Sequence, residues 1–489
     1  MTKILSTAFL LVVSVTAGAA GTPPPNLLII QTDEHNFRTL GCYRQTLADQ
    51  QAFVWGKDAV VETPAIDSIA QRGAICTSYY ATSPVCTPSR AAFFSGRYPQ
   101  NTGSWQNDRP LSGDIVTFAE VLRRQGYSTG YAGKWHLDGA GKPQWQPKRK
   151  FGFTDNRFMF NRGHWKKFEL TADGPRVAAR SKQGDPSYSL AGADQESFST
   201  DWLSNRAMDF IRKHAGEPFC YHLSLPDPHG PNAVRAPYDQ MFENTPIRPP
   251  ATFQTEYPLP KYIGSGAKNA KLSFRADQMS LYFGMVRCID DNVGRILALI
   301  DELNLTDRTI VVFTSDHGDL CYEHGRLNKG NPYEGSAKIP MIIAAPGKIP
   351  AGKRIDQALG TVDFAPTILS LMEMDSPDGI EGRDASALLV GNADQPSWDD
   401  VTFLRSAGSK PGWLAAVSDQ YKLVVSVADV PWLFDLKSDP DELINHAGDP
   451  EHAADLQRLA QAMVAYAQAS TDPHMESSEI SSALKSLVQ

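Results

Sequence analysis

A cysteine at position 86 lies in a stretch whose residue types suit anion chemistry. Cys86 opens the run Cys-Thr-Pro-Ser-Arg, so the guanidinium of Arg90 follows four positions later. The run is typical of a helix start, where free backbone N–H groups attract negative charge. A cysteine in such surroundings is acidic and reactive, and the same surroundings would hold a sulfate or a phosphate group.

Other polar residues follow four short apolar runs that are typical of buried strands. The runs cover 26–32, 128–133, 219–225 and 309–314, and the residues at their ends are Asp33 with Glu34, Lys134 with His136, His229, and Asp316 with His317. Any one group is equally well explained as a solvated strand end. Four together predict a shared site, because parallel strands bring their carboxyl ends to one edge of a sheet, where ligands bind.

The elements that must position these residues alternate along the chain. Helix patterns separate the strands, one beginning at Pro64 and others lying around 118–125, 202–211 and 281–303. This alternation predicts an α/β fold in which helices sandwich a large, mostly parallel sheet.

The pattern of secondary-structure signals in the sequence changes after about residue 370. Strand patterns at 421–427 and 432–436, and a helix pattern at 453–469, predict a smaller C-terminal α+β subdomain that contains an antiparallel sheet. We therefore expect an N-terminal domain over 21–370 and a C-terminal subdomain over 371–489.

Composition bounds the class of protein. Of 489 residues, 42% are hydrophobic and 21% charged, which excludes a disordered or fibrous chain. Lysine and arginine number 47 against 55 aspartates and glutamates, a net charge of −8. We expect no nucleic-acid partner, because phosphate binding needs a positive field.

The first twenty residues are typical of a secretory signal peptide. Lys3 precedes an apolar run over 4–15, and small residues at 17–20 offer a cleavage site. The alternative is a buried N-terminal strand or helix. We expect export to the periplasm or secretion, without a lipid anchor, since no cysteine lies at the cleavage site. After residue 20 the sequence contains no run of 18 apolar residues, so we expect no membrane span.

The six cysteines are too few for a disulfide framework in a chain of this size, and their spacings fit no zinc pattern. Cys76, Cys220 and Cys288 lie in apolar surroundings and are expected in the core. Any pairing stays open.

Five stretches, in order along the chain, resemble the type I sulfatases, the formylglycine-dependent members of the alkaline phosphatase superfamily. They are SPVCTPSRAAFFSGRYPQNTG (83–103), GYSTGYAGKWHL (126–137), TSDHGD (314–319), NKGNPYEGSAKIP (328–340) and LFDLKSDPDE (433–442). The resemblance runs from about residue 26 to 445, and in particular the chain is similar to secreted bacterial polysaccharide sulfatases. It implies an alkaline phosphatase-like fold and a sulfuric ester hydrolase that removes sulfate from a polysaccharide or its oligosaccharides.

The resemblance also implies covalent catalysis at Cys86. In that family a formylglycine-generating or sulfatase-maturing enzyme oxidises the matching cysteine to formylglycine, whose hydrated aldehyde is a geminal diol. One hydroxyl attacks sulfur and releases the alcohol. Deprotonation of the other expels sulfate and restores the aldehyde.

The family's metal ligands match Asp33, Asp316 and His317, beside residue 86 itself. Glu34 stands where the family often has aspartate, so its direct ligation is left open. Oxygen-rich ligation suits Ca²⁺ best, while His317 leaves Mg²⁺ and Mn²⁺ open.

The resemblance implies a role for each remaining polar residue. Lys134 and Lys329 match the lysines that bind sulfate, as point charges on its oxygens. His136 matches the histidine beside the diol and is assigned as the base of the elimination step. His229 matches the histidine near the leaving oxygen and is assigned as the general acid. Arg90 is expected to orient residue 86 and to support its anionic form.

A segment over 142–185 is strongly basic, although the chain as a whole is acidic. It carries eleven lysines and arginines against four acidic residues, a net charge of +7, with seven interleaved aromatic residues. One interpretation is a solvated loop. The other is a surface that meets a polyanion and stacks on sugar rings. We expect the segment to border the mouth of the site.

Two other functions stay open from the sequence. Sulfate and phosphate esters have similar shapes, so a phosphodiesterase or phosphonate monoester hydrolase on the same scaffold is the first alternative. A non-catalytic glycan-binding protein is the second. The sugar, the sulfated position, endo or exo action and the oligomeric state are not predicted.

Overall fold

The computed structural model describes residues 24–254, 256–263, 272–391 and 398–489. The expected signal peptide over 1–20 therefore lies outside the described residues. Within those ranges, no helix is both long enough and apolar enough to cross a membrane.

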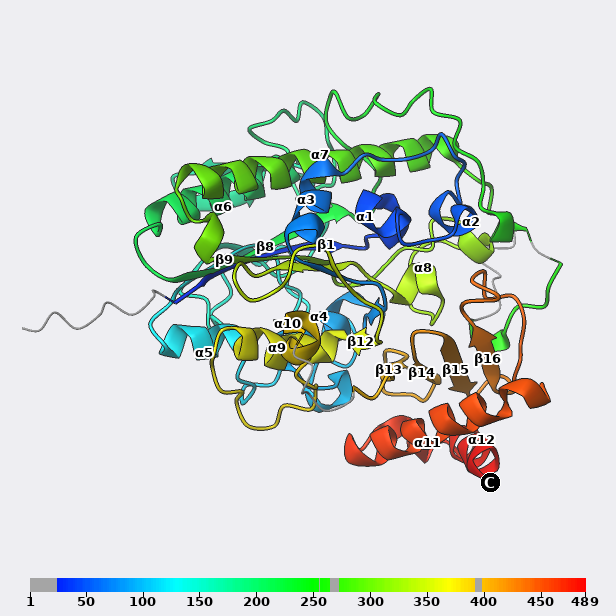
Figure 1. The fold of residues 1–489 in the computed structure, drawn as a ribbon. Coiled ribbons are helices and arrows are strands. Elements are labelled where there is room, and N and C mark those ends of the chain that lie inside the picture. The colour runs from blue at the N-terminus through cyan, green and yellow to red at the C-terminus, as the bar shows by residue number, and fades with distance from the viewer. Residues whose placement is uncertain (1–23, 255, 264–271, 392–397) are drawn as a thin grey trace, which may run out of the picture.

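An eight-stranded sheet forms the centre of the molecule (Figure 1). Its spatial order is β11-β2-β10-β9-β1-β8-β4-β5. Its strands are β1 (Asn26–Asp33), β2 (Ala74–Cys76), β4 (Ser128–Lys134), β5 (Asp155–Phe160), β8 (Phe219–Pro228), β9 (Thr309–Ser315), β10 (Met341–Ala344) and β11 (Lys353–Ile355). Only β10 runs antiparallel to its neighbours in this sheet, so the mostly parallel sheet expected from the sequence is confirmed.

Helices cover both faces of this sheet, and the alternation of side chains along β1 shows why. Leu27 and Ile29 point into one hydrophobic cluster and Leu28 and Ile30 into another. The helices of the chain are α1 (Gly41–Arg44), α2 (Asp49–Ala52), α3 (Pro64–Arg72), α4 (Cys86–Ser95), α5 (Phe118–Arg124), α6 (Ser199–Lys213), α7 (Ala276–Glu302), α8 (Glu334–Ala337), α9 (Phe364–Leu371), α10 (Ser386–Val390), α11 (Ala453–Ala469) and α12 (Ser478–Val488). In Figure 1, α3, α6 and α7 lie above the sheet, and α4, α5, α9 and α10 lie below it. A strand buried on both faces needs apolar residues on both sides, as the run Leu27, Leu28, Ile29 and Ile30 provides in the middle of β1.

Five neighbouring strands, in the order β9-β1-β8-β4-β5, all run parallel. Their carboxyl ends therefore meet at one edge of the sheet. The residues at these ends, or just after them, include Asp33, Lys134, His164, His229 and Asp316. This edge is the place where an open α/β sheet binds its ligands.

A second, antiparallel sheet of four strands lies toward the C-terminus (Figure 1). It consists of β13 (Thr402–Arg405), β14 (Trp413–Val417), β15 (Tyr421–Ser426) and β16 (Trp432–Asp435), and one face packs on α11 and α12. Leu389 of α10 still packs beneath the large sheet, whereas the second sheet begins at Thr402. The domain boundary near residue 370 stays a prediction.

Two further strand pairs are short. They are β3 (Tyr79–Tyr80) with β12 (Leu359–Gly360), and β6 (Phe168–Thr171) with β7 (Gly174–Val177). The six cysteines are all buried and unpaired, and Cys76, Cys220 and Cys288 lie in the core as expected.

Candidate active site

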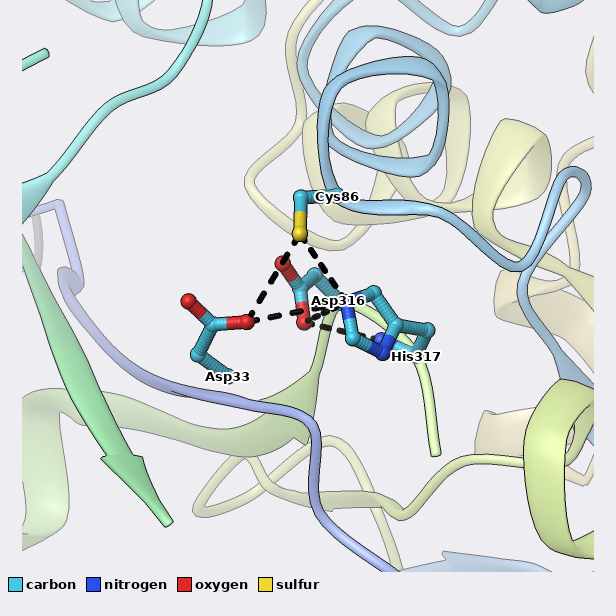
Figure 2. A group of neighbouring side chains, drawn as sticks. All are labelled: Asp33, Cys86, Asp316 and His317. Carbon is cyan, nitrogen blue, oxygen red and sulfur yellow. Dashed lines mark hydrogen bonds and ion pairs between the residues drawn. The ribbon is translucent and has the colours of Figure 1, made fainter. Parts of the chain in front are cut away.

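Four side chains from three elements converge at the carboxyl edge of the large sheet (Figure 2). Asp33 ends β1, Asp316 and His317 directly follow β9, and Cys86 is the first residue of α4. Each offers a ligand atom, and all four atoms lie within 4.8 Å of one another. The sequence expectation that Asp33 and Asp316 flank residue 86 agrees with this geometry.

The spacing of these atoms fits one divalent cation. Nε2 of His317 lies 3.1 Å from Sγ of Cys86, 3.6 Å from Oδ1 of Asp33 and 3.5 Å from Oδ1 of Asp316. Sγ of Cys86 lies 3.9 Å from Oδ1 of Asp33. Ligand atoms about 2.3–2.6 Å from a Ca²⁺ ion, at right angles to each other, would be roughly 3.3–3.7 Å apart. The two carboxylates already face buried cations, Asp33 facing Lys134 and Asp316 facing Arg90, so the spacing of the ligand atoms, and not uncompensated negative charge, indicates a metal.

Arg90 lies on α4, one turn after Cys86, and is completely buried. Its Nε donates to Oδ2 of Asp316 at 2.8 Å, and Nη1 donates to the carbonyl of Lys134 and the hydroxyl of Ser224. The sequence assigned Arg90 to orient residue 86. The structure instead bonds its guanidinium to Asp316, so it fixes one candidate metal ligand directly and Cys86 only through the helix.

Lys134 ends β4 and is completely buried beside the four-residue group. Its Nζ forms an ion pair with Oδ2 of Asp33 and lies 3.5 Å from Sγ of Cys86. Burial raises the pKa of Cys86, but the charges of Lys134 and Lys329 outweigh burial and hold that pKa well below its ordinary value. The expectation of an acidic thiol thus has a physical cause in the structure, although lysines supply the charge and Arg90 does not bond to it.

Glu34 lies outside the four-residue group, so the structure gives no support to the possibility that it is a direct metal ligand. Its carboxylate instead contacts the histidine expected near the leaving oxygen, His229, and one of the two lysines expected to bind sulfate, Lys329. Oε2 of Glu34 is 2.8 Å from Nε2 of His229, and Oε1 is 3.0 Å from Nζ of Lys329. The backbone of Glu34 has a positive φ of 62°, a conformation that few residues other than glycine adopt.

His229 directly follows β8, and its contacts restrict its protonation. Nδ1 lies 2.8 Å from the carbonyl of Gly230, so Nδ1 must carry the proton that is donated. Nε2 then either accepts from Nζ of Lys329, at 2.8 Å, or is protonated and donates to Glu34. The second state is the one that a general acid requires.

His136 follows β4, and its backbone carbonyl accepts a hydrogen bond from the hydroxyl of Thr87 at 2.9 Å. This bond ties residue 136 to the first turn of α4. Nε2 of the ring pairs with Oδ1 of Asp108 at 3.1 Å. Nδ1 is buried and makes no hydrogen bond within the described residues, so it is available to take up a proton.

His164 is a site residue that the sequence interpretation missed. Its Nε2 lies 2.9 Å from Nζ of Lys134 and 3.5 Å from Oδ2 of Asp33. Its ring stacks on that of His229, with centroids 3.4 Å apart and an interplanar angle of 8°. The missed signal was the strand before it: β5 ends at Phe160, and the chain then crosses the same edge of the sheet as the other strand ends.

The basic segment over 142–185 does border the site, through His164, but most of its seven aromatic residues are buried and do not offer a stacking surface. Phe153, Phe160 and Phe168 are 0% exposed, and Trp165 is 3% exposed. Since they fill the core, the expectation that the segment's interleaved aromatic residues stack on sugar rings is wrong for these members. Its charges at 148–150 remain at least partly exposed.

Comparison with known proteins matches this chain to two family models. The model described as Sulfatase matches residues 25–374, and the model described as N-sulphoglucosamine sulphohydrolase, C-terminal, matches residues 322–469. Among curated relatives, Arylsulfatase K of Xenopus laevis is 29% identical over 86% of this chain and 81% of its own length. An ulvan-active sulfatase of Formosa agariphila is 28% identical over 87% of this chain and 78% of its own length.

Solved structures share the fold. A protein in complex with its substrate, D-glucosamine-2-N,6-O-disulfate, superimposes with a TM-score of 0.73 over 93% of this chain and 100% of its own, at 22% identity. A phosphonate monoester hydrolase of Silicibacter pomeroyi has a TM-score of 0.70 over 92% of this chain and 96% of its own, at 23% identity. The fold alone therefore accommodates both sulfate and phosphonate chemistry.

Proposed function

The chain belongs to the sulfatase family, and from this premise we propose that it hydrolyses sulfate esters of a carbohydrate, either a polysaccharide or its oligosaccharides. The observation that carries the proposal is the convergence of Cys86 with Asp33, Asp316 and His317 beside a buried lysine. Two curated relatives support the carbohydrate: one is named an ulvan-active sulfatase, and another, from Bacteroides thetaiotaomicron, an N-acetylglucosamine-6-O-sulfatase.

The proposal includes two groups that the family implies. We assign Ca²⁺ to the site of Asp33, Asp316, His317 and residue 86, with Mg²⁺ and Mn²⁺ as the alternatives that metal analysis separates. We assign Cys86 as the residue that a maturing enzyme oxidises to formylglycine. When present, the cation supplies positive charge against the sulfate and the aldehyde hydrate supplies the nucleophile.

The chain's own residues perform the remaining work. Lys134 and Lys329 bind the non-bridging oxygens of the sulfate and neutralise their charge. His229, protonated at Nε2, gives its proton to the leaving oxygen, and Nδ1 of His136 takes up the proton released in the second step. Glu34 keeps His229 and Lys329 together between these events, since both contact its carboxylate.

Mass spectrometry of the active protein tests this proposal. We expect the peptide that spans Cys86 to be lighter than its unmodified form, because –CH₂SH becomes –CHO. Cys86→Ala should abolish turnover of an aryl sulfate without changing the unfolding midpoint, and Cys220→Ala is a control for loss of a buried thiol far from the sheet edge. An active enzyme with only unmodified Cys86 contradicts the assignment.

Rates on paired substrates separate sulfate from phosphate chemistry. We expect kcat/KM on an aryl sulfate to exceed that on the matching phosphate diester or phosphonate monoester. The reverse order would assign the phosphonate activity of the structural neighbour. Turnover of neither, with binding of sulfated glycan, would indicate a non-catalytic glycan-binding protein.

We also propose that the chain is exported, on the strength of the signal-like residues 1–20. Expression in a bacterial host should give a periplasmic or secreted protein whose N-terminus begins shortly after residue 20. Recovery of the full-length chain from the cytosol of its native host would contradict this.

A further inference from the structure

A cavity of about 210 Å³ adjoins the sulfate site on the side of His229 and Lys329. Gly230, which follows His229, and Asn328, which precedes Lys329, both line it. Tyr282 also lines the cavity, and its hydroxyl donates to the carbonyl of Glu34 at 2.9 Å, so the cavity wall contacts the residue that pairs with His229 and Lys329. The cavity is therefore placed to receive a group that is attached to the sulfate through the leaving oxygen.

The cavity wall combines apolar side chains with groups that bond to hydroxyls. Asn232, Gln278, Asp319 and Tyr322 supply the polar groups, whereas the hydroxyl of Tyr282 is already bonded to the backbone of residues 34 and 36. Oδ1 of Asp319 accepts the backbone N–H groups of Cys321 and Asn328, which fixes the carboxylate in place. Its Oδ2 makes no hydrogen bond within the described residues and is free to accept one. Amide, carboxylate and tyrosine groups in a small concave site suit a polar, hydroxyl-bearing ligand.

The charge of this wall differs from that of the opposite side of the site. No lysine or arginine is among the described residues that line the cavity, and Asp319 contributes a negative charge. Across the site, Lys134 and Arg162 lie on the side of His164, where Nη1 of Arg162 pairs with Asp108 at 3.0 Å. An anionic substituent in the cavity would face the carboxylate of Asp319. Lys329, whose charge also acts on Asp319, is already paired with Glu34 at 3.0 Å, so the approach of the anion is unfavourable at a partly buried site.

We propose that this cavity binds the uncharged, hydroxyl-bearing part of the sugar ring whose sulfate is removed. The inference rests on the proposed function and adds a specificity to it. The volume of the cavity is below the range of about 300–1,000 Å³ that is typical of pockets for drug-sized ligands. It therefore accommodates roughly one monosaccharide. A neutral sugar with one sulfate is accepted, whereas a second sulfate or a uronate carboxylate on the ring portion in the cavity is disfavoured.

Kinetics on matched oligosaccharides test the proposal. The wild-type protein should show at least a tenfold higher kcat/KM on a monosulfated neutral oligosaccharide than on the same oligosaccharide with an additional sulfate or carboxylate on the sulfated ring. Asn232→Lys should reduce that ratio at least fivefold, because the new cation pairs with the added anion. A ratio near one in the wild type, or a ratio that Asn232→Lys leaves unchanged, overturns the inference.

A cavity-filling variant provides a second measurement. Leu327 lines the cavity and is 36% exposed, so Leu327→Trp adds volume there without removing a polar contact. We expect the ratio of kcat/KM on the sulfated sugar to kcat/KM on an aryl sulfate to fall at least tenfold, mainly through KM. Leu170→Trp, at an exposed position of β6, is the matched control and should keep the ratio.

The two proposals fail differently. If no variant and no wild-type preparation hydrolyses any sulfate ester, the proposed function fails. If aryl sulfate and sugar sulfate are both hydrolysed, but neither Leu327→Trp nor Asn232→Lys changes the ratios, the function stands and the cavity does not bind the sugar. Unfolding midpoints close to that of the wild type show that a change in ratio is not a folding defect.

Discussion

Charge around Cys86 is balanced residue by residue. Asp33 has one carboxylate oxygen near Cys86 and His317, while the other faces Lys134 and His164. Burial raises the pKa of Asp33, but the charges of Lys134 and His229 and the bond from His164 outweigh burial and hold that pKa well below its ordinary value. The carboxylate therefore stays ionised and available to a cation.

Asp316→Asn should weaken the metal site most directly. The substitution keeps the shape of the side chain but removes the charge, and it takes from the buried guanidinium of Arg90 the closer of its two anionic partners, leaving Asp33 at 4.0 Å. We expect at least a 10–100-fold loss of metal affinity, on the scale seen when the surroundings of a metal site are altered. Bound metal and kcat/KM on an aryl sulfate measure it. Asp209→Asn, on an exposed part of α6, should change neither, and full metal content in Asp316→Asn would contradict the assignment.

His164→Ala tests the residue that the sequence interpretation missed. Removing the ring takes away the neighbour of Lys134 and the stacking partner of His229. We expect kcat/KM on an aryl sulfate to fall on the order of 10–100-fold, the range typical when a residue that contacts a metal ligand is lost.

The companion substitutions show whether His164 acts by position. His164→Asn keeps a polar side chain and should restore part of the activity. His214→Ala, where the ring packs near the exposed end of α6, is the control. If His164→Ala has the kinetics of the wild type, the contacts of His164 with Lys134 and His229 do not contribute to catalysis.

At the scale of elements, long apolar strands were predictable and short or polar ones were not. The runs at 26–32 and 309–314 became β1 and β9 with one more residue each, because both strands are buried on both faces. By contrast, β5 begins with Asp155, Asn156 and Arg157, and only its last three residues are fully apolar. An edge strand of this composition is not distinguishable from a loop by periodicity alone.

The same difference between strands explains which residues of the candidate site could be predicted from the sequence. Asp33, Lys134, His229 and Asp316 could be predicted because each ends a recognisable strand and matches a family motif. His164 could not, because it follows β5. The sequence also could not indicate that the carboxylate of Glu34 contacts His229 and Lys329, because the left-handed backbone at this residue leaves no signal in the residue pattern.

The loop between β4 and β5 carries charges that reach solvent. Lys148 and Lys150 are exposed and Arg149 is half-buried. Neutralising all three to glutamine should lower kcat/KM on a sulfated polymer several-fold at low salt and less at high salt, because steering by exposed charge is screened. Turnover of a small aryl sulfate should change little. Equal losses on both substrates would instead place these residues in support of the fold.

At the scale of the whole molecule, a buried lysine of the C-terminal sheet, Lys422, connects that sheet to the segment that follows Lys329. Nζ of Lys422 on β15 contacts Glu334 at 2.7 Å, Glu442 at 2.8 Å and the carbonyl of Pro332 at 2.8 Å. Pro332 lies three residues after Lys329. The C-terminal subdomain therefore helps to hold one of the two lysines of the sulfate site.

One lysine between two buried carboxylates makes stability depend on pH. Burial and the charge of Glu334 outweigh Lys422 and raise the pKa of Glu442 from 4.5 to about 7. Since the folded pKa is the higher one, the stability contributed by protonation is present below pH 4.5 and is lost as the pH rises through about 7.

Glu442→Gln should flatten this part of the pH profile. Urea unfolding between pH 4.5 and 7.5 should show a decline in the wild type on the order of 2 kcal/mol that is reduced in the variant. Glu373→Gln, at an exposed carboxylate, should keep the wild-type slope. An unchanged slope in Glu442→Gln would assign the titration to another group.

The burial of Cys86 imposes an order of events on the life of the chain. Its side chain is 2% exposed, and His317, which contacts its sulfur, comes 231 residues later in the sequence. Once β9 has docked, a separate enzyme has no path to the thiol, so the proposed oxidation must happen while the chain is still incomplete or open. Folding and modification therefore compete in time. A host that folds this chain faster than it oxidises Cys86 would accumulate a folded, stable protein that keeps an unmodified cysteine and stays inactive.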